Sequence, residues 1–278
     1  MTTVLVTGAG GQLGRELVEV FAGADVVAAG HDRLDVGDRD AVVGAITSLR
    51  PDVVVHAAAW TAVDACEADP DRANRVNALG TRHVADGARR VGAHVVYLST
   101  DYVFDGSKVG AYDEWDAPAP ASVYGRTKRG GELELDPGWT TVRTSWVFGR
   151  HGANFVKTVL RLAAEPGELR MVDDQRGCPT SAADLAAVVR TLALGRLPGV
   201  FHVTNQGPTT WWQLARDILA GAGDDPTRVV PISSADLDRP APRPANSVLD
   251  NAALRLSGIA LPPDHHDPLD RLVKELIA

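Results

Sequence analysis

Tyr124 and Lys128 stand four residues apart in a stretch that we expect to be helical. Residues at this spacing lie on one helix face, one above the other. An ammonium group beside a phenol stabilises the phenolate, so the pair predicts a tyrosine whose pKa lies below its usual value of about 10. A tyrosine of this kind can exchange a proton with a carbonyl or an alcohol. An ordinary surface helix can carry the same spacing by chance, so the rest of the chain has to decide.

The amino-terminal residues form a strand–turn–helix pattern that is typical of dinucleotide-binding proteins. A short β-branched run, Thr3–Thr7, leads into Gly8, Gly11 and Gly14, and an amphipathic helix is expected from Arg15 onward. The spacing G-x-x-G-x-x-G permits a tight turn and lets backbone N–H groups approach a pyrophosphate at the helix N-terminus. The alternative is a glycine-rich turn without a ligand. The position of the turn after the first strand favours a cofactor.

The residues after the second expected strand bear on which nicotinamide cofactor binds. This strand is Asp25–Ala29, and NAD-specific proteins usually place an acidic residue at its end. Gly30 stands there instead, which leaves room for a 2′-phosphate, and Arg33 could pair with that phosphate. We therefore expect NADPH, while Asp32 keeps NADH open.

Further strands alternate with helical stretches. Strands are expected at 51–56, 93–99 and 140–148, and helices at 38–49 and 71–91. Such alternation indicates βαβ units and a doubly wound parallel sheet of the Rossmann type, an α/β fold. In such sheets the ligand lies outside the carboxyl ends of the strands. Thr100 and Asp101 follow the fourth strand at this edge, and the small residues Ala57–Ala59 follow the third.

The alternation fades after residue 150. Helices are expected at 154–164, 184–194, 211–222 and 269–277, a strand at 199–204, and an irregular loop at 231–244. We therefore predict a cofactor domain over 1–149 with a returning segment near 177–206. A smaller mixed α/β lobe, formed by 150–176 and 207–278, would bind the substrate. One of the adjacent residues Trp211 and Trp212 could line the cleft between the cofactor domain and this lobe.

Composition excludes several classes of protein. The net charge of −8 argues against a nucleic-acid-binding surface. The two cysteines, Cys66 and Cys178, show no metal-ligand spacing, and neither do the histidines, so no metal site is predicted. His265 and His266 are expected in a solvated loop. We find neither a signal peptide nor an apolar run long enough for a membrane span, and we expect a cytoplasmic location.

Several motifs together resemble the extended short-chain dehydrogenases. They are Thr7–Gly14, Ala57–Ala59, Ser99–Phe104 and the Tyr124/Lys128 pair. Further motifs resemble, more narrowly, the dTDP-4-dehydrorhamnose reductases: His56–Asp64, Arg143–Val147, Asp174–Thr180 and Arg243–Ser247. The motifs run nearly from end to end of the chain, and the last two lie outside the cofactor domain.

The resemblance implies a reaction and a role for each matching residue. The reaction is reduction of the C4 keto group of dTDP-4-dehydro-β-L-rhamnose, with Thr100, Tyr124 and Lys128 as the catalytic residues. The implied substrate contacts are Val63, Thr100, Asp101, Tyr124, Trp146 and, on charge grounds, Arg243. The implied cofactor contacts are Gly8, Gly11, Gln12, Leu13, Gly14, Arg33, Asp35, Val36, Ala57, Ala58, Ala59, Thr61, Tyr124 and Lys128.

Two alternatives to this reaction stay open. One is a sister reductase that acts on another dTDP-4-keto-6-deoxysugar, and the other is a non-catalytic, nucleotide-binding regulatory subunit. Some members of the family form dimers that bind magnesium through glutamates. Glu16 and Glu275 match two of those positions, but Ala183 stands at the third, so a magnesium site is doubtful and a homodimer is only an expectation.

Overall fold

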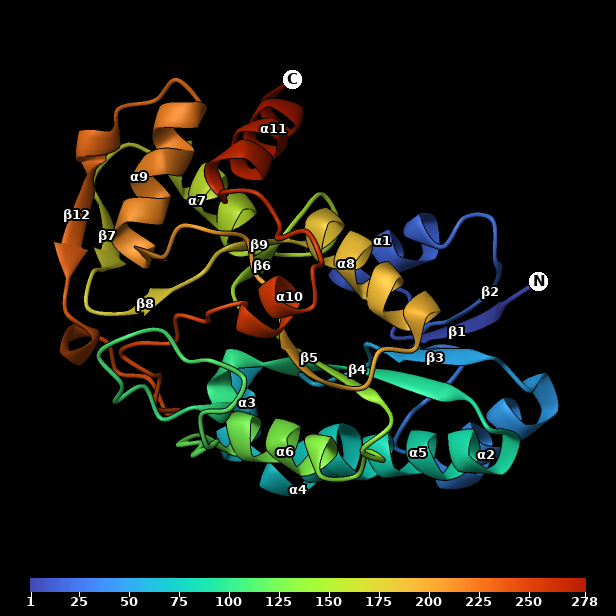
Figure 1. Ribbon diagram of the computed structural model, residues 1–278. Helices are drawn as coiled ribbons and strands as arrows, with labels where there is room; N and C mark the ends of the chain where they lie inside the picture. Colours follow the sequence, from blue (N-terminus) through green and yellow to red (C-terminus); the bar gives the residue numbers. More distant parts are fainter.

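The computed structural model describes residues 1–278 and contains one six-stranded sheet with the strand order β10-β5-β4-β3-β1-β2 (Figure 1). All neighbouring strands in it are parallel. The strands are β1 (Thr3–Thr7), β2 (Asp25–Ala29), β3 (Val53–His56), β4 (His94–Thr100), β5 (Thr140–Thr144) and β10 (Gly199–His202). The predicted doubly wound, Rossmann-type fold is confirmed.

Helices cover both faces of the sheet (Figure 1). One face packs against α1 (Gln12–Val20) and α8 (Ala182–Gly195), and the other against α2 (Arg39–Leu49), α5 (Gly80–Val91) and α6 (Val123–Glu132). Successive strand residues point to opposite faces, so Val4 and Val6 join the first core while Leu5 joins the second. Burial on both sides explains why the strands read as continuous apolar runs.

The helix predicted over 71–91 is interrupted by a π-helical segment. The chain forms α4 (Pro70–Ala73), then η1 (Asn74–Leu79), and only then α5. Within η1, Asn77 is buried and joins two neighbours: its Oδ1 accepts from Trp60 N at 2.8 Å, and its Nδ2 donates to Thr127 Oγ1 at 3.0 Å. The segment therefore ties the loop after β3 to α6.

The strand predicted over 140–148 is broken at Trp146. That residue adopts a left-handed conformation with φ of 47°, which strands do not contain. The chain turns there and continues as β6 (Val147–Phe148), which pairs with β9 (Thr180–Ser181) rather than with the main sheet. The break separates the sheet from the second lobe.

The second lobe packs three helices around its own core: α7 (Phe155–Ala163), α9 (Trp211–Gly221) and α11 (His266–Ile277) (Figure 1). Three short elements, α3 (Val63–Ala68), η2 (Asp101–Val103) and α10 (Ala252–Leu256), lie in the connections. Two short strand pairs complete the lobe: β7 (Leu169–Val172) with β12 (Val229–Ile232), and β8 (Arg176–Gly177) with β11 (Thr209–Thr210). The prediction of an irregular loop from 231 missed β12, which contains a proline.

No helix has the length and apolarity needed to cross a membrane.

Candidate active site

A cavity of about 570 Å³ lies at the carboxyl edge of the sheet, against the second lobe. This volume suits a small-molecule ligand. Most of the predicted site residues line it: Gly8, Gly11, Gln12, Leu13, Gly14, Ala57, Ala59, Thr61, Val63, Thr100, Asp101, Tyr124, Lys128 and Trp146. Segments far apart in the sequence thus meet where the strand order predicts a ligand.

The glycine-rich turn forms one end of the cavity. Gly8 has a φ of 68°, and a Cβ there would lie 2.7 Å from the backbone of Ala58. A Cβ at Gly14 would lie 2.1 Å from the carbonyl oxygen of Gly8, so this turn and the helix can pack only without side chains. Gly11 is the N-cap of α1 and provides no side chain to cap the first-turn N–H groups. These donors are left available to an anionic ligand.

Thr100 and Asp101 lie beside each other at the end of β4. The hydroxyl of Thr100 donates to Asp101 Oδ1 at 2.9 Å and accepts from the Tyr102 N–H at 3.2 Å. Asp101 Oδ2 is buried and has no hydrogen-bond partner. Burial raises the pKa of Asp101 to about 6. Asp101 lines the cavity, but its Oδ2 is closed off from it, so a substrate hydroxyl can reach that oxygen only after the side chain rotates.

Tyr124 lies in the first turn of α6, where Ser122 caps the helix by accepting from the Gly125 N–H at 3.1 Å. Its ring is buried and meets the edge of the Tyr102 ring, with 5.6 Å between centroids. Burial raises the pKa of Tyr124 well above its usual value, and the Thr100 hydroxyl opposes this only in part. The phenol therefore keeps its proton at neutral pH.

Lys128 lies one turn further along α6 and is almost completely buried. Its ammonium group donates to the carbonyl oxygen of Leu98 at 2.6 Å and lies 4.2 Å from the centroid of the Tyr97 ring. Burial lowers the pKa of Lys128 to about 7, although the nearby Glu132 carboxylate acts in the opposite direction.

The predicted lowering of the tyrosine pKa by this lysine is wrong for the cofactor-free chain. The Lys128 ammonium is engaged by the Leu98 carbonyl, and the largest influence on Tyr124 is burial, which disfavours the phenolate. The helical spacing placed both residues on one face, as expected. It could not show that desolvation outweighs the charge of the neighbour.

A buried ion pair holds α6 against the sheet. Arg143 on β5 donates to both carboxylate oxygens of Glu132, at 2.8 and 2.9 Å. Ser99 on β4 donates to the same carboxylate at 2.6 Å. These bonds join two strands to the last turn of α6 and so fix the helix that carries Tyr124 and Lys128.

Two stacked indole rings form the wall on the side of the second lobe. The rings of Trp146 and Trp211 lie parallel, with 3.6 Å between centroids and 12° between planes. The left-handed conformation of Trp146 directs its ring toward the second lobe instead of along the sheet. A Cβ at Gly177 would lie 2.4 Å from that ring, so glycine is required there. Of the adjacent tryptophans, Trp211 lines the cavity, while Trp212 donates to the Val229 carbonyl at 3.0 Å.

Some predicted ligand contacts do not line the cavity. They are Arg33, Asp35, Val36, Ala58 and Arg243. Arg33 is exposed in the loop after β2. Arg243 forms a two-pronged ion pair with Asp64, with both N–O distances at 2.6 Å, and this pairing lowers the pKa of Asp64.

The cavity also has lining residues to which no ligand contact was assigned. Ser99, Tyr102, Thr144, Ser145 and Val147 lie within the motifs, and Trp211 was one of the two tryptophans expected at the cleft, whereas Leu98, Gly152 and Ala153 lie outside every motif. Several of them follow the break in the chain after β5, which the expected continuous strand had hidden. Their position at the carboxyl end of a parallel strand was the available signal.

A second, smaller cavity of about 260 Å³ brings together Glu16, Ala183 and Glu275, the three positions that the family resemblance associates with magnesium. Arg150 lines it too and donates to both oxygens of Glu16, at 3.0 and 3.2 Å. Arg150 thus already pairs with the Glu16 carboxylate, and the side chain of Ala183 has no donor atom for a metal. These residues do not fit a magnesium ion.

The parallel sheet, the glycine turn after β1 and the Thr100, Tyr124 and Lys128 side chains around one cavity place the chain among the Rossmann-type oxidoreductases of the short-chain dehydrogenase class. The chain belongs to the family described as RmlD substrate binding domain, whose model matches residues 1–278.

Its relatives include a dTDP-4-dehydrorhamnose reductase of Streptomyces griseus, 46% identical over 92% of this chain and 88% of that protein. A probable dTDP-4,6-dihydroxy-2-methyloxan-3-one 4-ketoreductase of Streptomyces antibioticus is 45% identical over 99% of this chain and 95% of that protein. Among solved structures, a dTDP-4-dehydrorhamnose reductase of Bacillus anthracis in complex with NADP has a TM-score of 0.95 at 38% identity, covering 99% of this chain and 100% of that one.

Proposed function

We propose that this chain reduces the C4 keto group of dTDP-4-dehydro-β-L-rhamnose to give dTDP-β-L-rhamnose, with NADPH as the reductant. The observation that carries the proposal is the meeting of Thr100, Tyr124 and Lys128 in one cavity with a glycine turn at one end and stacked tryptophans at the side. Relatives named as dTDP-4-dehydrorhamnose reductases and a similar structure that holds NADP support it.

The glycine turn and the uncapped start of α1 fit the pyrophosphate of a dinucleotide, because the backbone N–H groups there have no competing side chain. Ala57, Ala59 and Thr61 would lie along the rest of the cofactor. Bound NADPH supplies the hydride that reduces the carbonyl carbon. We propose Arg33, exposed after β2, as the partner of the 2′-phosphate.

The residues at the other end of the cavity would handle the proton and the sugar. Tyr124, which stays protonated at neutral pH, donates its proton to the carbonyl oxygen as negative charge develops there. The Thr100 hydroxyl, which donates to Asp101 Oδ1 in the absence of ligand, would turn its one proton to the same oxygen and so orient the carbonyl. Asp101 would accept from a sugar hydroxyl once its side chain rotates toward the cavity, and Trp146 packs against the sugar ring.

The direct test is to mix the purified chain with dTDP-4-dehydro-β-L-rhamnose and NADPH or NADH and to follow the loss of cofactor absorbance. We expect oxidation of NADPH in equal amount to the sugar nucleotide consumed. No oxidation of either cofactor would remove the proposal and would favour a nucleotide-binding role without catalysis.

A second candidate substrate is another dTDP-4-keto-6-deoxysugar. The Streptomyces antibioticus ketoreductase is nearly as similar to this chain as the Streptomyces griseus reductase, and a Streptomyces niveus relative is named dTDP-4-keto-6-deoxy-D-glucose reductase at 41% identity. Thr100, Tyr124 and Lys128 would serve in the reduction of any ketone that the second lobe admits to the cavity. Turnover of each keto-sugar, with product stereochemistry determined by NMR, distinguishes the candidates.

Adding one methyl group at Gly177 should weaken binding of the sugar nucleotide. The Gly177→Ala side chain would collide with the Trp146 ring and displace it from the cavity wall. We expect KM for the sugar nucleotide to rise roughly tenfold, which corresponds to about 1.4 kcal/mol, while KM for NADPH stays unchanged. Gly138→Ala is the matched control, because a Cβ at Gly138 meets nothing within 4 Å. An unchanged KM for the sugar in Gly177→Ala would contradict the role given to Trp146.

A further inference from the structure

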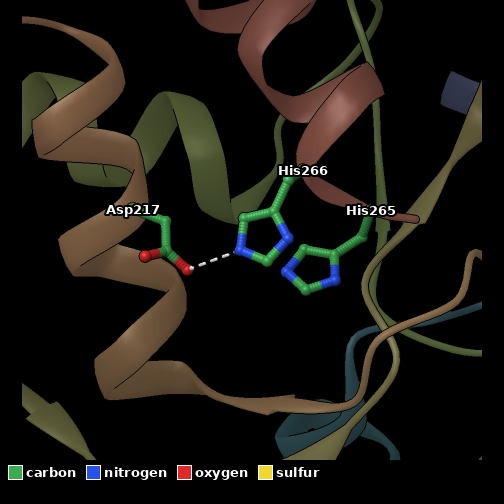
Figure 2. A group of neighbouring side chains, drawn as sticks. All are labelled: Asp217, His265 and His266. Atoms are coloured by element: carbon green, nitrogen blue, oxygen red, sulfur yellow. Dashed lines mark ion pairs between the residues drawn. The ribbon is translucent and has the colours of Figure 1, made fainter.

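Three side chains that could bind a metal meet between α9 and α11, in the second lobe (Figure 2). They are Asp217 on α9, His265 immediately before α11 and His266 at its first position. One ligand atom from each lies within 4.8 Å of the others. The prediction of a solvated loop at His265 is wrong, because that residue is only 1% exposed.

Two atoms of this cluster are buried without a hydrogen-bond partner, namely His265 Nε2 and Asp217 Oδ2. Leaving a buried polar atom unpaired costs about 1–3 kcal/mol, and more for a charged group, so the pair requires an explanation. His266 Nε2 forms an ion pair with Asp217 Oδ2 at 3.6 Å, a separation too long for a hydrogen bond (Figure 2). The two unpartnered atoms, His265 Nε2 and Asp217 Oδ2, thus belong to the same cluster as His266 Nε2.

Neighbouring groups fix the orientation of both imidazole rings. His265 Nδ1 lies 3.2 Å from the carbonyl oxygen of Gln206, and His266 Nδ1 lies 2.6 Å from Asp264 Oδ1. Since a carbonyl oxygen or a carboxylate can only accept, each Nδ1 carries a proton, and in the neutral form of each ring Nε2 is the nitrogen with the free lone pair. Histidines that bind metals are held in this manner, with the second ring nitrogen donating to a carbonyl or a carboxylate.

The carboxylate of Asp217 is oriented as well. Its Oδ1 accepts from Gln213 Nε2 at 2.8 Å, one turn earlier on α9, and this leaves Oδ2 for the cluster. Two imidazoles and one carboxylate form the ligand set of zinc and similar first-row ions, while magnesium and calcium prefer oxygen ligands alone. Around a tetrahedral ion with bonds of about 2.0–2.1 Å, ligand atoms stand roughly 3.3 Å apart. The 3.6 Å between His266 Nε2 and Asp217 Oδ2 is close to this value, and small side-chain rotations would move His265 Nε2 to the same spacing.

We propose that Asp217, His265 and His266 bind a divalent ion of the zinc class, with water at the fourth position. The ion would link α9 to the start of α11 and hold the carboxyl-terminal helix in place. Because α9 begins at Trp211, which lines the main cavity, the link would also stiffen that wall. The site takes no part in hydride or proton transfer, so the proposal stands apart from the proposed reaction.

The test uses the full chain without a histidine tag, stripped of metal by a chelator and then dialysed. Zn²⁺ is titrated in by calorimetry, and Co²⁺ is added separately because its visible absorption reports a four-coordinate site with nitrogen and oxygen ligands. We expect one ion per chain and a rise in Tm of roughly 5 °C at a hundredfold excess over Kd. Mg²⁺ at the same concentration should leave Tm unchanged.

Variants separate a built site from adventitious binding. His266→Asn and Asp217→Asn remove one ligand each, and we expect each to weaken Zn²⁺ binding at least tenfold; Asp264→Asn, which only orients His266, should weaken it by roughly 10–100-fold. The exposed side chain of His266 makes its variant the safe one for folding, while His31→Asn, an exposed histidine elsewhere, is the control. Equal Zn²⁺ affinity in His266→Asn, Asp217→Asn and the control, or no binding by the unaltered chain, would overturn the proposal.

Discussion

The Tyr124→Phe variant should turn over the keto-sugar roughly a thousandfold more slowly than the unaltered chain, within the range of 10²–10⁴ that a positioned general acid contributes. The substitution removes only the phenolic oxygen, so the ring still packs against Tyr102 in the buried site. Without the phenol, the developing charge on the carbonyl oxygen keeps only the hydrogen bond from Thr100. Steady-state kcat measures this loss.

Cofactor binding should be unaffected in the same variant, because the glycine turn lies at the other end of the cavity. Titration of NADPH fluorescence gives that affinity directly. Tyr112→Phe is the control, since that phenol donates to Asp105 outside the cavity. A Tyr124→Phe variant with full turnover would show that another group delivers the proton.

The Lys128→Met variant should lose activity and, at low pH, become more stable than the unaltered chain. Burial lowers the pKa of Lys128 from 10.5 to about 7. Holding the ammonium inside the fold below that pH therefore costs stability, on the order of 5 kcal/mol. Methionine fills nearly the same space without the charge. The site thus gives up stability for a cation beside the reacting groups.

The sign of the pH dependence follows from the two pKa values. Between about pH 7 and 10.5 the unfolded chain holds a proton on Lys128 that the folded chain has released, so stability of the unaltered chain rises with pH in that window. The variant lacks this contribution. The Tm of Lys128→Met minus that of the unaltered chain should therefore be larger at about pH 6 than at about pH 10, by roughly 5 °C.

Thermal unfolding across this pH range checks the prediction, with Lys274→Met, an exposed lysine on α11, as the control. A Tm difference that does not change with pH would mean that the buried ammonium is not destabilised. Turnover of Lys128→Met, measured in parallel, should be lost below about pH 7, where Lys128 is charged in the folded chain and no other cation takes its place.

Local patterns were sufficient for the cofactor half of the molecule. Continuous apolar runs, a glycine turn directly after the first strand and hydroxyl and carboxylate residues directly after the fourth all depend on neighbours in sequence. Parallel strands bring their carboxyl ends to one edge, so Gly8 and Thr100 could be placed at one edge of the sheet, while Tyr124 was placed with them by the family resemblance.

Other features depend on contacts between distant segments. The break at Trp146 depends on two distant residues. Gly177 leaves room for the Trp146 ring, and Trp211 stacks on it. Arg243 turned to Asp64 instead of the cavity, because a carboxylate distant in sequence lies within reach. No spacing rule could have shown either.

The sequence by itself determined the doubly wound sheet and the glycine turn, because each rests on short-range pattern, and the family resemblance marked Thr100, Tyr124 and Lys128 as candidate catalytic residues. Only the tertiary structure decided the protonation of Tyr124 and Lys128. Desolvation raises the pKa of Tyr124 and lowers that of Lys128, and desolvation depends on everything packed around a group. The cluster of Asp217, His265 and His266 also depends on tertiary structure, because it forms only where α9 and α11 pack against each other.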